Sequence, residues 1–257
     1  MKISVFGAAG RMGQKILSLA KMQKDIEIAG ALEIDTSVAI GSGEPPIIKV
    51  SQIDEVLNET DVFIDFTNPV STLANAAKIS AAKKAIVIGT TGFTQEQKDQ
   101  IKEFAKVSPI VLSPNMSVGV NVMFSLVKQA ALTLPDYDTE IIEMHHNKKK
   151  DSPSGTAAKL AEIIAQAHNQ KLDDIAVYER RSVNRARTKE EIGIMSVRAG
   201  GIVGDHSVLF AGGDEIIEIK HRADSRDIFA IGALRAAQWL FGQKAGLYDM
   251  QDVLDLK

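Results

Sequence analysis

The sequence predicts an α/β protein in two parts: a doubly wound parallel sheet at the N-terminal end, then an α+β part with a mostly antiparallel sheet. Two observations predict this. Up to Pro114, short apolar and β-branched runs alternate with stretches whose apolar residues recur at helical spacing. After Pro114 the rhythm changes, because most of the later strand-like runs follow one another with few helical stretches between them.

The first part shows regular alternation of strands and helices. The predicted strands are Lys2–Ala8, Ile26–Leu32, Val62–Phe66, Ala85–Gly89 and Ile110–Leu112. The predicted helices are Arg11–Met22, Val70–Ala82 and Gln95–Val107. Such alternation is typical of a Rossmann-type unit, in which ligands bind outside the carboxyl ends of the strands.

The second part begins with a long apolar helix, Val120–Leu134, and an alternating strand, Tyr137–His146. A helix over Ala157–His168 follows, and then four strands: Ala176–Arg180, Gly193–Ala199, His206–Ala211 and Glu215–His221. The last helix, Arg226–Phe241, is expected to return to the first part. We therefore expect one domain made of residues 1–116 and 225–257, and a second made of residues 117–224.

Composition excludes several classes of protein. The chain has 257 residues, of which 45% are hydrophobic and 25% charged, as in an ordinary globular protein. A net charge of −3 argues against broad nucleic-acid binding. Without cysteine there is neither a disulfide nor a zinc–thiolate site. No apolar run reaches membrane-spanning length and Met1 leads directly into a strand, so we expect a cytoplasmic protein with no membrane partner.

A glycine-rich loop follows the first predicted strand and opens the first helix. It reads Gly7, Ala8, Ala9, Gly10, Arg11, Met12, Gly13, a variant of the dinucleotide fingerprint. Glycines let the backbone approach a pyrophosphate, and the helix N-terminus presents free N–H groups to it. A plain structural turn is the alternative, but the position between strand and helix favours a cofactor site.

Glu33 ends the second strand about 20 residues after this loop, where an acid that binds the adenosine ribose is expected. Its carboxylate would accept hydrogen bonds from the ribose and repel a 2′-phosphate. Ile34 and Asp35 follow, so no adjacent arginine is available to bind that phosphate. We therefore expect NADH to be preferred and NADPH to remain possible, with Arg11 as the residue that argues for NADPH.

Two later segments follow strands at the same predicted edge of the sheet. They are Gly89, Thr90, Thr91 and Gly92, and Ser113, Pro114, Asn115 and Met116. Because ligands bind at the carboxyl ends of such strands, both segments are candidates for the nicotinamide end of the cofactor. Ordinary strand-to-helix turns are the alternative interpretation.

The segment from Glu143 to Thr156 gathers the residue types of a catalytic site. His145 and His146 end a strand, so their side chains point to opposite faces and cannot share one role. One could donate a proton while the other binds substrate, since histidine titrates near neutrality. A metal site is not expected, because adjacent histidines rarely chelate one ion and no carboxylate cluster accompanies them.

A lysine run and a helix start come directly after the histidines. Lys148, Lys149 and Lys150 precede Pro153-Ser154-Gly155-Thr156, so Gly155 and Thr156 fall in the first turn of the next helix. The N–H groups of that turn form a carboxylate or phosphate site, and a lysine facing it adds positive charge. The segment therefore favours a small anionic substrate.

These motifs together resemble the 4-hydroxy-tetrahydrodipicolinate reductase (dihydrodipicolinate reductase) family over nearly the whole chain. The motifs are G-A-A-G-R-M-G at Gly7, G-T-T-G-F at Gly89, S-P-N-M-S-V-G-V-N at Ser113, H-H-N-K-K-K-D-S-P-S-G-T-A at His145, R-A-G-G-I-V-G-D-H at Arg198 and R-A-A-Q-W-L at Arg235. The segment at His145 is the most specific of them. The resemblance implies NAD(P)H-dependent formation of tetrahydrodipicolinate on the diaminopimelate route to lysine.

The resemblance also implies roles for individual residues. His145 would be the proton donor, assisted by Lys149, while His146, Lys149, Gly155 and Thr156 would hold the dicarboxylate. The cofactor would lie along Gly7 to Met12, Glu33, Gly89 to Thr91 and Ser113 to Met116. The second domain would bind substrate and assemble a homotetramer through its sheets.

Two other functions are compatible with parts of the sequence. An NAD-dependent amino-acid dehydrogenase, for example one acting on aspartate, would share the nucleotide domain, but the His-His-Lys and Ser-Gly-Thr cluster argues against it. A regulator that binds NADH without turnover would share the glycine loop. The proton-donor segment argues against that reading, as does the absence from the sequence of a helix-turn-helix pattern with a basic face.

Overall fold

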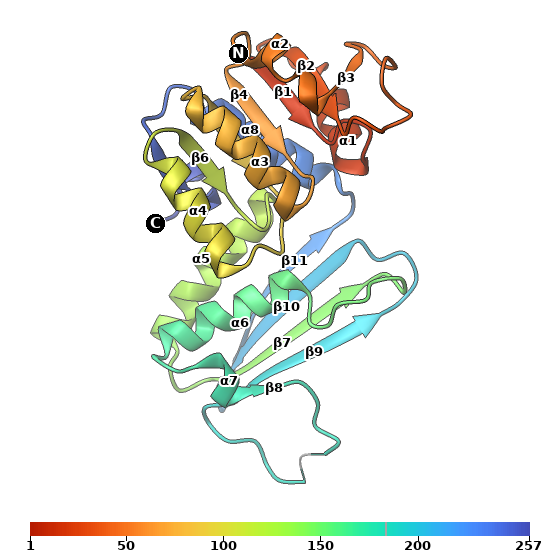
Figure 1. Cartoon of the computed structure of the whole chain (residues 1–257). Coiled ribbons are helices and arrows are strands. Elements are labelled where there is room, and N and C mark those ends of the chain that lie inside the picture. Colours follow the sequence, from red (N-terminus) through yellow and green to blue (C-terminus); the bar gives the residue numbers. More distant parts are fainter. Residues whose placement is uncertain (183) are drawn as a thin grey trace. The chain divides into compact units, whose positions relative to one another are not determined.

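The computed structural model describes residues 1–182 and 184–257. The chain divides into two compact units: Met1–Val118 together with Asp227–Lys257 form unit 1, and Gly119–Arg226 form unit 2 (Figure 1). Within the described residues no helix is long and apolar enough to cross a lipid bilayer.

Unit 1 contains a seven-stranded sheet in the order β12-β6-β5-β4-β1-β2-β3, and every neighbouring pair is parallel. Its strands are β1 (Lys2–Phe6), β2 (Glu27–Glu33), β3 (Ile47–Lys49), β4 (Val62–Asp65), β5 (Ala85–Ile88), β6 (Pro109–Leu112) and β12 (Gly246–Tyr248). The five predicted strands are all present. Strands β3 and β12 were not predicted, because three residues are too few to show a period. The strand order reverses between β1 and β4, so the carboxyl ends of these strands flank a ligand crevice.

Helices cover both faces of this sheet, as the doubly wound prediction requires. They are α1 (Arg11–Ala20), α3 (Pro69–Ala81), α4 (Gln95–Ala105) and α8 (Asp227–Leu240), with the shorter η1 (Val50–Gln52), α2 (Asp54–Leu57) and α9 (Met250–Val253). Helices α1 and α8 pack on one side in a core with Ile3, Val5 and Ile64. Helices α3 and α4 pack on the other side with Phe6 and Phe63 (Figure 1).

Unit 2 contains a five-stranded sheet in the order β11-β10-β7-β9-β8. Its strands are β7 (Asp138–His145), β8 (Ala176–Val177), β9 (Ile192–Arg198), β10 (Gly204–Ala211) and β11 (Ile216–Ala223). Strand β10 is antiparallel to β7 and β11, whereas β9 is parallel to β7 and β8. The predicted α+β class with a mostly antiparallel sheet is confirmed, and within this sheet β9 is the strand that pairs parallel to both of its neighbours. The chain crosses through helices between β7 and β9, and such a crossover makes the strands parallel.

One face of the unit 2 sheet is covered by α5 (Val118–Thr133) and α6 (Gly155–Ala167), with the short α7 (Leu172–Ile175) beside them. Residues on this face alternate along the strands, and Ile141, Ile194 and Val208 are fully or almost fully buried. The opposite face carries exposed apolar side chains, with Ile142 37% and Val197 40% exposed. The sheet therefore has one face that is filled within the unit and one that is not.

Candidate functional site

The glycine loop of unit 1 lies between β1 and α1, at the carboxyl edge of the sheet. Gly7 has a φ of 67°, a region that favours glycine, and Gly10 caps α1 without a side-chain hydrogen bond. A Cβ added to Gly13 would lie 2.1 Å from the carbonyl oxygen of Gly7. The helix therefore packs directly on the loop and its N-terminus stays uncovered, which fits a dinucleotide pyrophosphate.

Glu33, the last residue of β2, lies at this loop as predicted. Its Oε2 accepts a hydrogen bond from the backbone N–H of Ala9 at 3.0 Å, and its Oε1 accepts one from the N–H of Ile34 at 3.0 Å. Asp35, two residues later, is an exposed acid, whereas Glu33 is half-buried. Lys49, which the sequence analysis did not consider, pairs with Glu33 in the register of β2 and β3 and places a cation near this position.

The two later candidate segments follow β5 and β6, at the carboxyl edge shared with the glycine loop. Thr90 is buried, whereas Thr91 is exposed. Met116 is also buried, and a Cβ on Gly232 of α8 would lie 1.7 Å from its carbonyl oxygen. Ser113 donates through Oγ to the carbonyl of Asn115 at 2.9 Å, so this segment folds into a tight, well-packed turn.

Asp65, at the end of β4, organises this edge, although the sequence analysis did not single it out. Its carboxylate is fully buried and accepts hydrogen bonds from Thr67 Oγ1 at 2.6 Å, Thr72 Oγ1 at 3.0 Å and Asn75 Nδ2 at 2.8 Å. Thr72 and Thr90 share a further hydrogen bond of 2.9 Å. Asp65 thus ties the end of β4 to α3 and to the segment after β5.

In unit 2, the alternation of β7 places Glu143 and His145 on the face covered by α5 and α6. Glu143 is fully buried and His145 is 9% exposed, whereas His146, just after the strand, is half-buried. Glu143 Oε2 and His145 Nδ1 are 2.5 Å apart. His145 was a candidate from the sequence, whereas the glutamate two residues before it on the same face was not.

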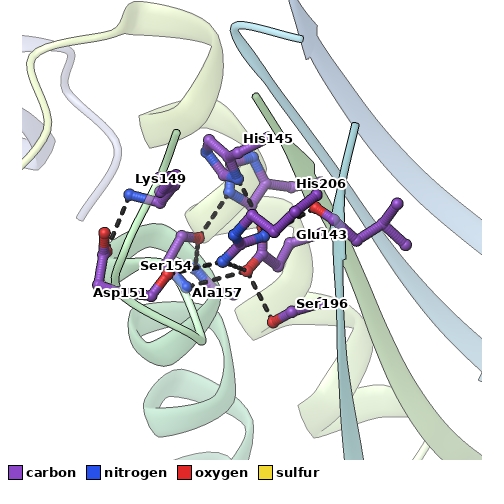
Figure 2. A network of polar contacts seen from close by, with 10 residues as sticks. Glu143, His145, Lys149, Asp151, Ser154, Ala157, Ser196 and His206 are labelled. Atoms are coloured by element: carbon purple, nitrogen blue, oxygen red, sulfur yellow. Dashed lines mark hydrogen bonds and ion pairs between the residues drawn. The ribbon is translucent and has the colours of Figure 1, made fainter. Parts of the chain in front are cut away.

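Glu143 is the centre of a polar network, most of which Figure 2 shows. Its Oε1 accepts hydrogen bonds from the backbone N–H of Ser154 at 3.1 Å, from Ser196 Oγ at 2.7 Å and from Arg198 Nη2 at 2.8 Å. Arg198 Nη1 donates to Oε2 at 3.0 Å, so the guanidinium binds both oxygens. The network joins β7, β9 and the start of α6.

The hydrogen bonds of this network determine the protonation states of Glu143 and Arg198. Burial opposes the ionisation of Glu143, but the hydrogen bonds from His145 and Arg198 outweigh it and hold the pKa of the carboxyl well below its usual range. The same pairing raises the pKa of Arg198. Glu143 is therefore an anion and Arg198 a cation at neutral pH.

A second histidine, His206 of β10, lies against His145. Their ring centroids are 5.2 Å apart in an edge-to-face arrangement, and Ser154 Oγ hydrogen-bonds His206 Nε2 at 3.1 Å. Burial, followed by the positive charge of His145, lowers the pKa of His206 to about 4. His206 is therefore neutral at pH 7, and it was not among the candidates from the sequence.

The other predicted residues surround the N-terminus of α6. Ser154 caps the helix by accepting from the N–H of Ala157 at 3.2 Å, and Gly155 and Thr156 form the first turn. A Cβ on Gly155 would meet no atom within 4 Å, so Gly155 borders open space. Lys149 pairs with Asp151 at 2.8 Å.

The surroundings of His146 are cationic. Burial, followed by the positive charges of Arg226 and His145, lowers the pKa of His146. Lys149 and Arg198 act in the same direction. A neutral histidine beside these cations and an open helix N-terminus form a setting suited to a small anion.

Comparison with known proteins identifies the family. The chain matches the family descriptions "Dihydrodipicolinate reductase, N-terminus" over residues 1–116 and "Dihydrodipicolinate reductase, C-terminus" over residues 119–254. It is 51% identical to the 4-hydroxy-tetrahydrodipicolinate reductase of Syntrophotalea carbinolica, with all of both chains covered, and 47% identical to that of Aquifex aeolicus, with 100% and 99% covered. Its fold is similar to that of a dipicolinate-bound dihydrodipicolinate reductase from Paenisporosarcina sp. TG-14, with a TM-score of 0.80, 27% identity and 98% of each chain covered.

Proposed function

We propose, because this chain belongs to the dihydrodipicolinate reductase family, that it reduces 4-hydroxy-tetrahydrodipicolinate, through dihydrodipicolinate, to tetrahydrodipicolinate with NAD(P)H. This reaction lies on the diaminopimelate route to lysine. The observation that carries the proposal is the site in unit 2, where a histidine bound to a buried carboxylate lies on the strand that leads to Lys149 and the start of α6.

The residues around the glycine loop fit a dinucleotide. Among the described residues no side-chain hydrogen bond caps the start of α1, and the close approach of Gly13 to Gly7 leaves no room for a side chain at Gly13. We assign Gly7 to Met12 to the pyrophosphate and Glu33 to the ribose, with Gly89 to Thr91 and Ser113 to Met116 at the nicotinamide. When bound, the reduced nicotinamide supplies a hydride.

The residues of unit 2 bind the dicarboxylate and supply the proton. His146, Lys149, Gly155 and Thr156 hold the carboxylates through cationic groups and helix N–H groups. Once the ring has accepted hydride at the carbon distal to its imine nitrogen, the resulting enamine is protonated by His145 at the neighbouring carbon. A positioned acid contributes on the order of a hundredfold or more, and Lys149 stabilises charge as it develops.

The choice between NADH and NADPH follows from the charges beside the ribose position. Glu33 and Asp35 place two acids there, and a 2′-phosphate beside them would be repelled. Lys49 and the exposed Arg11 are the cations that would oppose this preference. We expect NADH to be the better substrate, and a higher kcat/KM with NADPH would refute this assignment.

We also propose that the chain assembles into a homotetramer through the open face of the unit 2 sheet. Ile142 of β7, Val197 of β9 and Ile216 of β11 are 37%, 40% and 64% exposed on that face. Exposed apolar side chains on a sheet face that no helix covers are typical of an interface. Light scattering on the purified protein tests this proposal, and a monomer at micromolar concentration would refute it.

The test of the function is a coupled assay. Pyruvate and aspartate semialdehyde are condensed in situ by the synthase that makes the substrate, and oxidation of NADH or NADPH is followed by absorbance at pH 7. We expect rapid turnover that depends on the synthase, and dipicolinate should inhibit it by occupying the substrate site. NADH binding without turnover would refute the reductase and favour a sensor instead.

A further inference from the structure

We propose that Glu143, which is hydrogen-bonded to Arg198, is a positioning residue. It fixes the tautomer and orientation of His145 so that only Nε2 exchanges a proton with the substrate ring. This inference rests on the proposed function. It concerns two groups that had no role assigned from the sequence, Glu143 and Arg198, and it follows from hydrogen-bond donors and acceptors that converge on one buried carboxylate.

The tautomer follows from the chemistry of the pair. Glu143 is ionised, and a carboxylate without a proton can only accept hydrogen bonds. His145 Nδ1, at 2.5 Å from Glu143 Oε2, must therefore carry the hydrogen. In the imidazolium both nitrogens carry hydrogens, and loss of one from Nε2 leaves the neutral form that is protonated at Nδ1 and still bound to Glu143. The proton that reaches the substrate therefore leaves from Nε2.

The carboxylate is itself held in place. Arg198 binds both of its oxygens and also donates through Nη2 to the carbonyl of Asp151 at 2.7 Å. The N–H of Ser154 and the hydroxyl of Ser196 add two further donors to Oε1. Because Ser196 and Arg198 come from β9 and Ser154 is the cap of α6, rotation of the glutamate would break contacts to both elements at once.

Gly204 and His206 border the side of His145 that does not face Glu143. A Cβ on Gly204 would lie 3.0 Å from His145 Nε2, so a side chain at that position would crowd the reactive nitrogen. His206 borders the other part of the ring and is neutral at pH 7, so it does not compete for the role of acid. The surroundings of His145 thus leave one nitrogen engaged with Glu143 and the other bordered by glycine.

Replacing the carboxylate with an amide of the same shape tests this arrangement. In Glu143→Gln the amide oxygen should occupy the Oε1 position, because Ser154 N–H and Arg198 Nη2 both donate there. The amide NH₂ then lies at the Oε2 position, where it donates to His145 Nδ1 and displaces Arg198 Nη1, which donates to that oxygen in the wild type. His145 is thereby held as the neutral tautomer that carries its hydrogen on Nε2. This tautomer cannot serve as the acid, because loss of its only N–H proton would leave an imidazolate anion.

Two readouts follow from Glu143→Gln. In the coupled assay we expect kcat to fall about a hundredfold or more with KM little changed. In two-bond ¹H–¹⁵N spectra the hydrogen of neutral His145 should move from Nδ1 in the wild type to Nε2 in the variant. The matched control is Glu162→Gln, which makes the same change in the same unit at an exposed carboxylate of α6 that pairs with Lys159 at 3.3 Å. We expect the control to keep kcat within about twofold and the tautomer unchanged.

The outcomes separate this proposal from the proposed function. If wild-type protein does not turn over the ring substrate, the function fails, while the tautomer spectra still test the role of Glu143. If the wild type is active and Glu143→Gln keeps its kcat or the tautomer at Nδ1, the positioning role is refuted.

If Glu143→Gln does not fold, Arg198→Lys replaces it. This variant keeps the positive charge but loses the two-pronged contact, so we expect an intermediate loss of kcat, and wild-type kcat would refute the proposal.

Discussion

Removing the arginine that holds Glu143 should destabilise the protein substantially. In Arg198→Met two hydrogen bonds to the carboxylate are lost, at 2.8 and 3.0 Å, and Glu143 remains fully buried. Breaking a buried ion pair from one side costs about 3–5 kcal/mol. Since Arg198 is 21% exposed and Glu143 keeps its contacts with His145, Ser154 and Ser196, we expect the lower end, about 3 kcal/mol.

The size of this loss should depend on pH. The pKa of Glu143 is lower in the folded protein than in the unfolded chain, so its ionised form stabilises the fold fully above the ordinary glutamate pKa of about 4.3. That stabilisation is lost as the pH falls from there toward the folded-state pKa. The difference in unfolding free energy between wild type and Arg198→Met should therefore be largest at pH 7 and smaller at pH 4.

Urea denaturation followed by circular dichroism at both pH values measures the difference. The control is Arg181→Met, which makes the same change at an exposed arginine of the same unit and should alter the unfolding free energy by less than about 0.5 kcal/mol. A loss below about 1 kcal/mol at pH 7, or a loss that grows toward pH 4, would show that Arg198 does not keep Glu143 ionised.

Three further predictions concern the reaction and the cofactor. His145→Gln should lower kcat on the order of a hundredfold with KM little changed in steady-state kinetics, and a near-normal kcat would assign the acid elsewhere. Gly13→Ala places a methyl group 2.1 Å from the carbonyl oxygen of Gly7, so it should cost about 1–3 kcal/mol in urea denaturation and weaken NADH binding measured by fluorescence. Lys49→Ala removes the cation beside Glu33 and should lower kcat/KM for NADPH more than for NADH. Equal effects on the two would show that Lys49 does not contact the 2′-phosphate region.

Much of the fold could be predicted because local patterns reflect it. The buried strands of unit 1 are continuous apolar runs, and their helices repeat apolar residues at helical spacing, so both periods are visible in the sequence. Strands β3 and β12 were missed because each has three residues and no recognisable period. The parallel pairing of β9 with β7 could not be predicted from the sequence, because register and direction depend on which strands meet, and a local pattern does not contain that information.

In the candidate site, too, some residues are recognisable from local motifs, whereas others are brought in only by strand pairing. Gly7 to Gly13, Glu33, His145, Lys149 and the Ser154–Thr156 helix start are recognisable because each belongs to a short motif with its own chemistry. Arg198 and Ser196 lie more than fifty residues after Glu143, and only the pairing of β7 with β9 places them on the same carboxylate. His206 reaches His145 in the same way, through the pairing of β10 with β7.

The sequence by itself therefore determined the fold class, the family and the candidate site residues, because these depend on local spacing and residue type. Only the tertiary structure decided how those residues are held and charged. The buried anion of Glu143, the neutral state of His206 and the nitrogen of His145 that is left to react all depend on desolvation and on donors from distant strands. Burial and long-range hydrogen bonding exist only once the chain has folded.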